Sequence, residues 1–399
     1  MKCVLIGPTY PFRGGIAHYT TLLCHELRKR HQVTLLSFRR QYPAWLFPGR
    51  TDRDPSQQVL AVDCERLLDP LLPWTWRTTA RRIEELEPDL VLVQWWVPFW
   101  APIWSVILWH VRRRIAGRVL FISHNVLPHE ARRWDRWLAR QVLGQGDAVI
   151  VHSQQDRQAL QTLLPAMDVR VAVLPTYEIF APQALSPSAA RRRLGLKEEQ
   201  RVLLFFGFVR AYKGVRYLIE AVSLLPDHLD IHLLIVGEFW DDVAPYREQI
   251  RTSGLEGRVT VIDRYIPNEE VGIYFAAADL VVLPYTEASQ SGVAQIAWGA
   301  GVPVITTSVG GLPDVIQDGA TGLLVPPGDS PALAAAILRY FEEGLSPTFR
   351  ANIQAQKARF SWERLAALIE ELAGGASVGE AVGSQEDKAG DRPGGMSAR

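Results

Sequence analysis

Short apolar segments alternate with longer segments of helical pattern along most of this chain. A short continuous apolar run is typical of a strand that is buried on both faces of a parallel sheet. Strands that alternate with helices at this spacing predict an α/β fold with a parallel, doubly wound sheet. In the second half of the chain, the strands we expect lie at 202–206, 231–236, 259–262, 280–283, 304–306 and 322–325.

The first half of the chain repeats this alternation, so we predict two Rossmann-like domains. Pro175, Pro182 and Pro187 interrupt the pattern between them, and proline breaks regular structure. In the first half, we expect strands at 3–6, 33–38, 90–94, 119–122, 148–152 and 169–174. The predicted division is a first domain at 1–178, a linker at 179–198, a second domain at 199–358, a final helix at 359–372 and a disordered tail at 373–399.

Residues 91–110 form the apolar stretch that is long enough to be considered as a membrane span, because they carry no charged side chain other than a histidine. Pro98 and Pro102 interrupt this stretch, and Gln94 adds a polar group. We therefore expect a buried strand followed by a helix.

Composition and charge narrow the class of protein. The 399 residues include 43 Lys and Arg and 43 Asp and Glu, so no net charge favours a nucleic-acid partner. Cys3, Cys24 and Cys64 have neither metal-site nor disulfide spacing, which fits a reducing compartment. The apolar run before Gly7 is too short for the core of a signal peptide. We therefore expect a cytoplasmic globular protein.

Residues 284–305 carry the first candidate site. A predicted strand leads into a loop of small residues that includes Ser291 and Gly292, and a helical pattern starts at Val293. The free N–H groups and the dipole at a helix N-terminus attract an anion, and glycine lets a phosphate approach the backbone closely. An ordinary strand–loop–helix unit has the same pattern, so this segment alone leaves both interpretations open.

Residues 201–218 carry two cations in a corresponding place. The predicted strand ends at Gly207, and Arg210 and Lys213 follow before Gly214 opens a helix. Cations at the carboxyl end of a strand, beside a glycine, suit a diphosphate. A solvated loop with incidental charges is the alternative for this stretch alone.

Together these two stretches resemble the C-terminal domain of GT-B-fold glycosyltransferases, most of all the large retaining family that uses nucleotide-diphosphate sugars, the glycosyl transferases group 1. The resemblance covers the chain from its first residues to about Leu372. It implies two Rossmann-like domains that face a cleft, with the last helix crossing back to the first domain. In that family, the Arg and Lys of a G-x-x-R-x-x-K-G segment hold the donor diphosphate, which implies this role for Arg210 and Lys213.

The chain departs from the family's pattern after the strand at 280–283. The family usually has two glutamates separated by seven residues, and the same spacing here gives Glu287 and Gln295. The second of these binds the donor ribose in the family, so the resemblance implies Gln295 for that contact and Glu287 for sugar hydroxyls or catalysis. An alternative alignment gives the loop role to Gln290 and Ser291.

Further positions follow from strand ends and from the same resemblance. His124 comes at the carboxyl end of a predicted strand, where a side chain points into the crevice of an open sheet, and a histidine there lies near the donor sugar in GT-B relatives. Gly14 and Gly15 form either a plain tight turn or, as the resemblance implies, a loop beside donor and acceptor. The catalytic positions implied are His124, Arg210, Lys213 and Glu287. The donor-binding positions implied are Gly14, Gly15, Gly207, Arg210, Lys213, Glu238, Ile266 (at the nucleobase), Gln290, Ser291, Gly292, Val293 and Gln295.

One segment of the first domain mixes basic and aromatic residues. Arg132, Arg133, Trp134, Arg136 and Trp137 have the composition of a segment that lies at an anionic membrane surface. Such contact would make the protein peripheral on the cytoplasmic face of a membrane, where a lipid-linked acceptor is within reach. The alternative is a helix face that is simply solvated.

We expect a glycosyltransferase, of hexosyltransferase type, that moves a sugar from a nucleotide-diphosphate sugar to a saccharide or lipid-linked acceptor, with the retention that the resemblance implies. Arg210, Lys213 and the helix N-terminus would stabilise charge on the leaving diphosphate, so we expect neither a metal nor a cofactor. The alternatives are a nucleotide-sugar-binding protein without transfer activity, which Gln295 in place of an acid favours, and a GT-B epimerase. A Rossmann dehydrogenase is disfavoured because no G-x-G-x-x-G follows Ile6.

Overall fold

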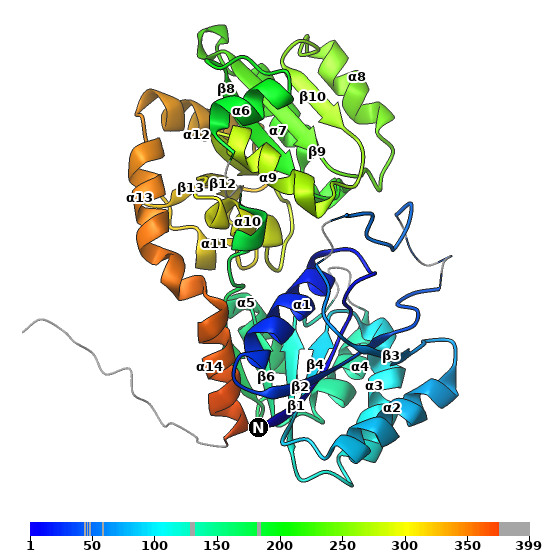
Figure 1. The fold of residues 1–399 in the computed structure, drawn as a ribbon. Helices are drawn as coiled ribbons and strands as arrows, with labels where there is room; N and C mark the ends of the chain where they lie inside the picture. The colour runs from blue at the N-terminus through cyan, green and yellow to red at the C-terminus, as the bar shows by residue number, and fades with distance from the viewer. Residues whose placement is uncertain are drawn as a thin grey trace, which may run out of the picture.

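The computed structural model describes residues 1–43, 45, 47, 49–57, 60–127, 132–181 and 185–374. These residues form two α/β domains, which lie one above the other in Figure 1. Each domain contains one parallel sheet with helices packed against it. The predicted fold class is therefore confirmed.

The first domain contains a seven-stranded sheet in the order β3-β2-β1-β4-β5-β6-β7. Every residue of β4 is buried, because helices cover both faces of the sheet. Its strands are β1 Lys2–Ile6, β2 Gln32–Phe38, β3 Glu65–Leu68, β4 Leu90–Trp95, β5 Arg118–Ser123, β6 Ala148–Val151 and β7 Asp168–Val171. Its helices are α1 Gly15–Arg28, α2 Pro73–Leu86, the 3-10 helix η2 Pro98–Trp100, α3 Ala101–Val111, α4 Arg133–Leu143 and α5 Gln154–Leu163.

The second domain contains a six-stranded sheet in the order β10-β9-β8-β11-β12-β13. The order reverses between β8 and β11, and ligands of open α/β sheets bind at such a switch point. Its strands are β8 Arg201–Phe206, β9 Ile231–Val236, β10 Val259–Ile262, β11 Leu280–Leu283, β12 Val304–Thr307 and β13 Gly322–Val325. Its helices, together with those of the connection, are η3 Glu178–Phe180, α6 Pro187–Arg193, η4 Ala211–Lys213, α7 Val215–Ser223, η5 Asp227–Leu229, α8 Ala244–Thr252, α9 Asn268–Ala277, α10 Gly292–Gly299, α11 Leu312–Val315, α12 Ser330–Glu342, α13 Ser346–Gln356 and η6 Lys357–Phe360.

The last helix, α14 Trp362–Ala373, returns to the first domain and packs against α1 and β5 (Figure 1). Glu370 Oε1 lies 2.7 Å from His31 Nε2 in the first domain. Its buried face consists of Leu365, Ala366, Ile369 and Leu372. The predicted crossing back of the last helix is therefore confirmed.

The apolar stretch at 91–110 forms β4, η2 and α3, so the prediction of a strand followed by a helix is confirmed. Trp100, Trp104 and Ile107 are fully buried in the core of the first domain. Among the described residues, no helix is long and apolar enough to cross a membrane.

Some element bounds differ from those predicted. The strand predicted at 169–174 ends at Val171. Strand β3 was not predicted, because its sequence ERLL is half polar and it lies at the edge of the sheet. Ala373 belongs to α14 rather than to the predicted tail. From residue 375 on, the tail lies outside the described residues.

Candidate active site

A cavity of about 340 Å³ lies between the two domains. Residues at the carboxyl ends of strands line it, which is the edge where open α/β sheets bind ligands. From the first domain and the connection, its lining residues are Gly14, Gly15, His18, Tyr177 and Phe180. From the second domain, they are Phe206, Gly207, Phe208, Arg210, Tyr212, Lys213, Gly237, Glu238, Trp240, Tyr265, Ile266, Asn268, Val271, Gln290, Ser291, Gly292, Val293 and Ile296.

The loop after β8 carries the two predicted cations into this cavity. Gly214 ends the loop with a φ of +68°, and a Cβ at this position would lie 1.9 Å from the carbonyl oxygen of Pro284. Glycine is therefore required both by the backbone conformation and by the close approach of the two loops. The backbone N–H of Thr286 donates to the carbonyl of Tyr212 at 2.8 Å, which fixes the loop after β8 against the loop after β11.

Aromatic rings hold both cations without neutralising their charge. The Arg210 guanidinium lies 5.6 Å from the centre of the Trp240 ring, and Lys213 Nζ lies 3.8 Å from the centre of the Tyr285 ring. Burial alone would lower the pKa of Lys213, but the attraction of the Tyr285 and Tyr212 groups outweighs it and raises the pKa above its ordinary value. Lys213 is therefore a cation at neutral pH, at the wall of the cavity.

Helix α10 presents its N-terminus to the same cavity. Ser291 is its N-cap, and its Oγ accepts from the N–H of Ala294 at 3.3 Å. Gly292 and Val293, in the first turn, line the cavity. Their N–H groups and the helix dipole add partial positive charge to that of the two cations. The arrangement suits a ligand with two or more negative charges.

A second cavity of about 320 Å³ adjoins the first. Lys213 and Gln290 line both cavities, whereas His124 and Asn125 line the second. The Gln290 side chain donates from Nε2 to the carbonyl of His124 at 3.2 Å and so joins the two domains. A molecule with its anionic part beside Lys213 therefore has room for a neutral part beside His124.

His124 is a neutral side chain in this structure. Burial, together with the neighbouring His152, holds the pKa of His124 well below its usual value. Its Nε2 lies 2.7 Å from Gln94 Oε1. The tautomer with its proton on Nε2 donates to this oxygen and leaves Nδ1 as an acceptor. Burial likewise lowers the pKa of His152 to about 4.

Two of the residues predicted from spacing lie elsewhere. Glu287 is exposed and Gln295 is fully buried, and neither lines the two cavities. On α10, the residue one turn after Gly292 is Ile296, and Ile296 takes the cavity position next to Val293. The ribose contact of Gln295 and the catalytic role of Glu287 stay predictions that this geometry does not support.

Most other predicted residues come together in the first cavity. They are Gly14, Gly15, Gly207, Arg210, Lys213, Glu238, Ile266, Gln290, Ser291, Gly292 and Val293, and their contacts with a donor stay predictions. The two carboxylate oxygens of Glu238 are bound to Arg13, so this side chain is tied to the first domain.

The aromatic side chains of the cavity wall and Arg13 were not among the residues predicted from the sequence. Phe208 directly follows Gly207, Trp240 comes two residues after Glu238, and Tyr265 directly precedes Ile266. Their closeness in sequence to predicted site residues was the available signal. Arg13 directly precedes Gly14, but its pairing with Glu238 spans 225 positions and no local pattern indicates it. Within the described residues, no group of His, Cys, Asp or Glu side chains is placed to hold a metal ion.

Two protein-family models match the chain. Residues 13–176 match Glycosyltransferase Family 4, and residues 200–343 match Glycosyl transferases group 1. The first match covers most of the first domain, and the second covers most of the second domain.

Curated relatives are similar over part of their length. The chain is 32% identical to the D-inositol 3-phosphate glycosyltransferase of Corynebacterium glutamicum (strain R) over 255 residues, which are 61% of this chain and 60% of that protein. It is 33% identical to the protein of the same name from a Nocardioides species over 245 residues, which are 57% of this chain and 53% of that protein. The chain therefore spans less than two thirds of the length of these relatives.

Solved structures share the fold over nearly the whole chain. Sucrose-phosphate synthase from Thermosynechococcus elongatus has a TM-score of 0.70 at 22% identity and covers 94% of this chain and 98% of its own. HepE from Anabaena, solved in complex with UDP-glucose, has a TM-score of 0.74 at 20% identity and covers 94% of this chain and 100% of its own. At these identities the similarity concerns the fold.

Proposed function

This chain has the GT-B fold and carries a glycosyltransferase family 4 segment followed by a glycosyl transferases group 1 segment, and on that basis we propose that it transfers a sugar from a nucleotide-diphosphate sugar to an acceptor. The observation that supports this most is that Arg210, Lys213 and the N-terminus of α10 converge on one cavity between the domains. HepE, which shares the fold, binds UDP and UDP-glucose, so UDP-glucose is the first donor to test.

In the proposed mechanism, the bond between the anomeric carbon and the diphosphate oxygen breaks, and an acceptor hydroxyl oxygen forms the new bond to that carbon. The diphosphate gains negative charge as it departs and takes up the hydroxyl proton. Lys213 is a point charge held beside Tyr285, and Arg210 offers a two-pronged donor. The N–H groups at the start of α10 complete the set of groups that would bind the diphosphate. Groups fixed in advance where charge develops stabilise the transition state more than the ground state. We propose that these groups make a divalent metal unnecessary.

The sugar and the acceptor would occupy the second cavity. In the tautomer that donates from Nε2 to Gln94, His124 Nδ1 is an acceptor nitrogen and suits a sugar hydroxyl group that donates a hydrogen bond. Retention of the anomeric configuration, as in the family that the chain resembles, is part of the proposal. The acceptor would be a saccharide, a lipid-linked glycan or, as in the names of the curated relatives, D-inositol 3-phosphate.

The base would lie beyond the diphosphate, at the apolar end of the first cavity. Ile266 is 5% exposed and follows β10. Phe208 and Tyr265 line the same cavity, with ring centres 6.2 Å apart. Flat apolar surfaces of this kind pack against a nucleobase.

A two-stage experiment tests the proposed function. Thermal unfolding is recorded with UDP-, GDP- and ADP-sugars, because a ligand that binds the native state raises the melting temperature. The donors that bind are then incubated with the acceptor panel, and products are identified by mass spectrometry, with a divalent-metal chelator in one arm. Transfer of the sugar to an acceptor supports the proposal. Binding without any product supports the alternative below, and no binding contradicts both.

The alternative is a nucleotide-sugar-binding protein without transfer activity. The observation that favours it is that neither Glu287 nor Gln295 lines either cavity. A GT-B epimerase would instead convert the donor without an acceptor, which the same mass-spectrometric assay detects as a change in the nucleotide sugar.

We also propose that the first domain contacts an anionic membrane surface. At the start of α4, Trp134 is 55% exposed and Trp137 is 59% exposed. Arg132, Arg133 and Arg136 are exposed beside them. Exposed basic and aromatic side chains on one short helix suit the interface between lipid headgroups and acyl chains. Such contact would bring a lipid-linked acceptor to the enzyme.

A further inference from the structure

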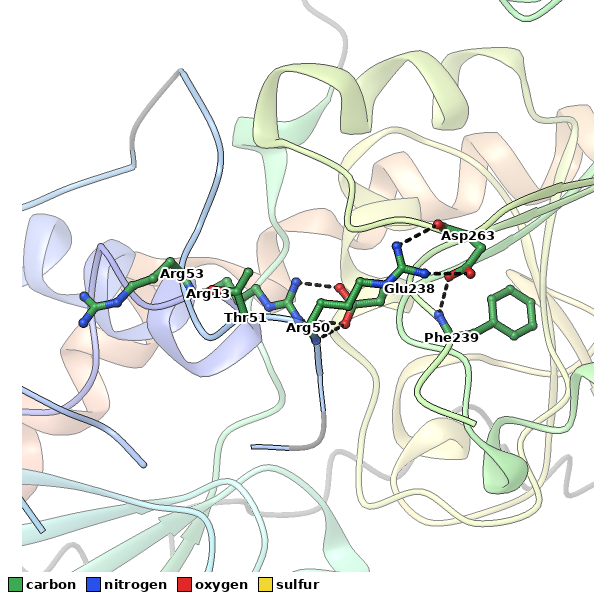
Figure 2. A network of polar contacts seen from close by, with 7 residues as sticks. All are labelled: Arg13, Arg50, Thr51, Arg53, Glu238, Phe239 and Asp263. Carbon is green, nitrogen blue, oxygen red and sulfur yellow. Dashed lines mark hydrogen bonds and ion pairs between the residues drawn. The ribbon is translucent and has the colours of Figure 1, made fainter. Parts of the chain in front are cut away.

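Arg13 and Glu238 form an ion pair between the two domains (Figure 2). Arg13 lies in the loop between β1 and α1, and Glu238 directly follows Gly237 at the end of β9. The guanidinium donates from Nη1 and Nη2 to the two carboxylate oxygens, at 2.7 and 2.9 Å. Each side chain is only 2% exposed. Two parallel hydrogen bonds between charged groups fix both the distance and the orientation of the partners.

A second set of contacts from the first domain surrounds this pair. The backbone N–H of Arg50 donates to Glu238 Oε1 at 2.9 Å, and the Arg50 guanidinium donates to Asp263 at 2.9 Å (Figure 2). Farther along the same segment, Ser56 Oγ accepts from the N–H of Asn268 at 2.9 Å. The backbone N–H of Arg13 donates to the carbonyl of Asp52 at 3.0 Å. The loops around residues 13 and 50–56 therefore meet the second domain as one unit.

The pair also belongs to the wall of the donor cavity. The Arg13 guanidinium lies 4.9 Å from the centre of the Tyr265 ring and 5.5 Å from that of Phe208, and both rings line the cavity. Gly14 and Gly15, which line the cavity from the first domain, follow Arg13 directly. Their position over the cavity therefore depends on where Arg13 is held.

We propose that Arg13 and Glu238 are a latch that holds the two domains closed over the donor cavity and positions Gly14 and Gly15 above it. A buried ion pair suits this task, because the cost of removing both charges from water offsets much of their attraction. Both groups become hydrated when the domains separate, so the latch opens and closes at little net cost. Arg13 is a positioning residue, since it touches Glu238 and aromatic rings rather than the reacting atoms.

The domain arrangement can be measured without any substrate. Small-angle X-ray scattering is recorded on the full chain of the wild type and of R13A, R13K and E238Q, with circular dichroism to confirm folding. We expect a larger radius of gyration for R13A and E238Q than for the wild type, and an intermediate value for R13K, which keeps the charge but loses the two-pronged geometry. The exchanged pair R13E/E238R should recover part of the closure.

The control is an ion pair of the same geometry within one domain. Arg112 donates to the two oxygens of Asp147 at 2.7 and 2.9 Å, and both residues belong to the first domain. R112A should therefore leave the radius of gyration unchanged. Scattering curves of folded R13A and E238Q that superimpose on the wild-type curve would overturn the latch.

The kinetic arm rests on the proposed function. If the chain transfers sugar, R13A should lower kcat about tenfold or more while the KM for the donor changes little, because misplacement of a covering loop affects the transition state more than binding. A wild-type kcat in R13A would also overturn the latch. If no nucleotide sugar is turned over by the wild type, the proposed function fails, whereas the scattering comparison still decides on the latch.

Discussion

The Nζ atom of Lys213 lies 3.8 Å from the centre of the Tyr285 ring. Tyr285 is fully buried two residues after the end of β11, so the ring is a rigid support that fixes the direction of the lysine. The same residue lies 3.3 Å from Ser291 Oγ through its hydroxyl group. Tyr285 thereby connects the cation of the β8 loop with the N-terminus of α10.

We predict that removing this ring weakens the site although the charge remains. A cation–π contact contributes roughly 0.5–2 kcal/mol. Tyr285→Leu should therefore lower kcat/KM by the factor that corresponds to a loss of this size in transition-state stabilisation. Tyr285→Phe is the matched control, because it keeps the ring and loses only the hydroxyl contact, and it should lose less. Equal losses in the two folded variants would show that the hydroxyl group matters and the ring does not.

We predict that the side-chain amide of Gln290, rather than that of Gln295, contacts the nucleotide sugar. Gln290 lines both cavities, whereas Gln295 is fully buried with neither amide atom hydrogen-bonded among the described residues. Gln290→Ala should weaken nucleotide-sugar affinity by roughly 1 kcal/mol, the scale of one lost hydrogen bond. Gln295→Met should leave that affinity unchanged in calorimetry. A loss of affinity in the Gln295 variant alone would restore the assignment made from sequence spacing.

The free energy of unfolding should decrease as the pH is lowered below 7, because two buried histidines stay neutral in the folded protein. The rings of His124 and His152 lie 5.2 Å apart, and the pKa of His152 is lowered from 6.5 to about 4 by burial. Between these pKa values the unfolded chain binds more protons than the folded one. The contribution of His152 to the free energy of unfolding is therefore fully present above pH 6.5 and is lost as the pH falls toward 4. For His152 alone the loss reaches about 3 kcal/mol near pH 4.

Urea unfolding at several pH values between 7 and 5 checks this prediction. His152→Gln should flatten the dependence of the unfolding free energy on pH. His228, whose side chain is 69% exposed, is the control. His228→Gln should leave the slope of the unfolding free energy against pH unchanged. The same slope in wild type and His152→Gln would contradict the assignment.

The basic and aromatic start of α4 should bind anionic vesicles. Flotation with liposomes that contain anionic lipid should recover the protein at low salt and release it at high salt, because salt screens charge attraction. Replacing Trp134 and Trp137 by Ser, and separately Arg133 and Arg136 by Gln, should each reduce recovery. Protein that stays unbound at low salt would leave this face as a solvated helix surface.

Much of the fold was predictable, because strands buried on both faces are continuous apolar runs. The sequence LVLVQW of β4, all of it buried, is such a run. The edge strand β3 gave no comparable signal, since two of its four residues are charged. Bounds at strand ends depend on hydrogen bonds to the neighbouring strand, which periodicity does not report.

The site was predictable where it is local. Arg210 and Lys213 follow one strand within a few residues, and Ser291 caps one helix. The face of α10 that meets the cavity depends on helix register, which places Ile296 at the cavity and its neighbour Gln295 in the core. The pairing of Arg13 with Glu238 depends on how the two domains meet and has no local signature.

The most direct test of the account is the turnover of UDP-glucose, or of the donor that binds best, by Lys213→Ala compared with the wild type. Charge on the leaving diphosphate grows in the transition state, so loss of the Lys213 ammonium should lower kcat more than it weakens donor binding. We predict a cost of about 3 kcal/mol in transition-state stabilisation, the scale that follows the loss of one preorganised donor. Near-normal kcat in a variant with wild-type circular dichroism would contradict the diphosphate assignment and with it the proposed donor site.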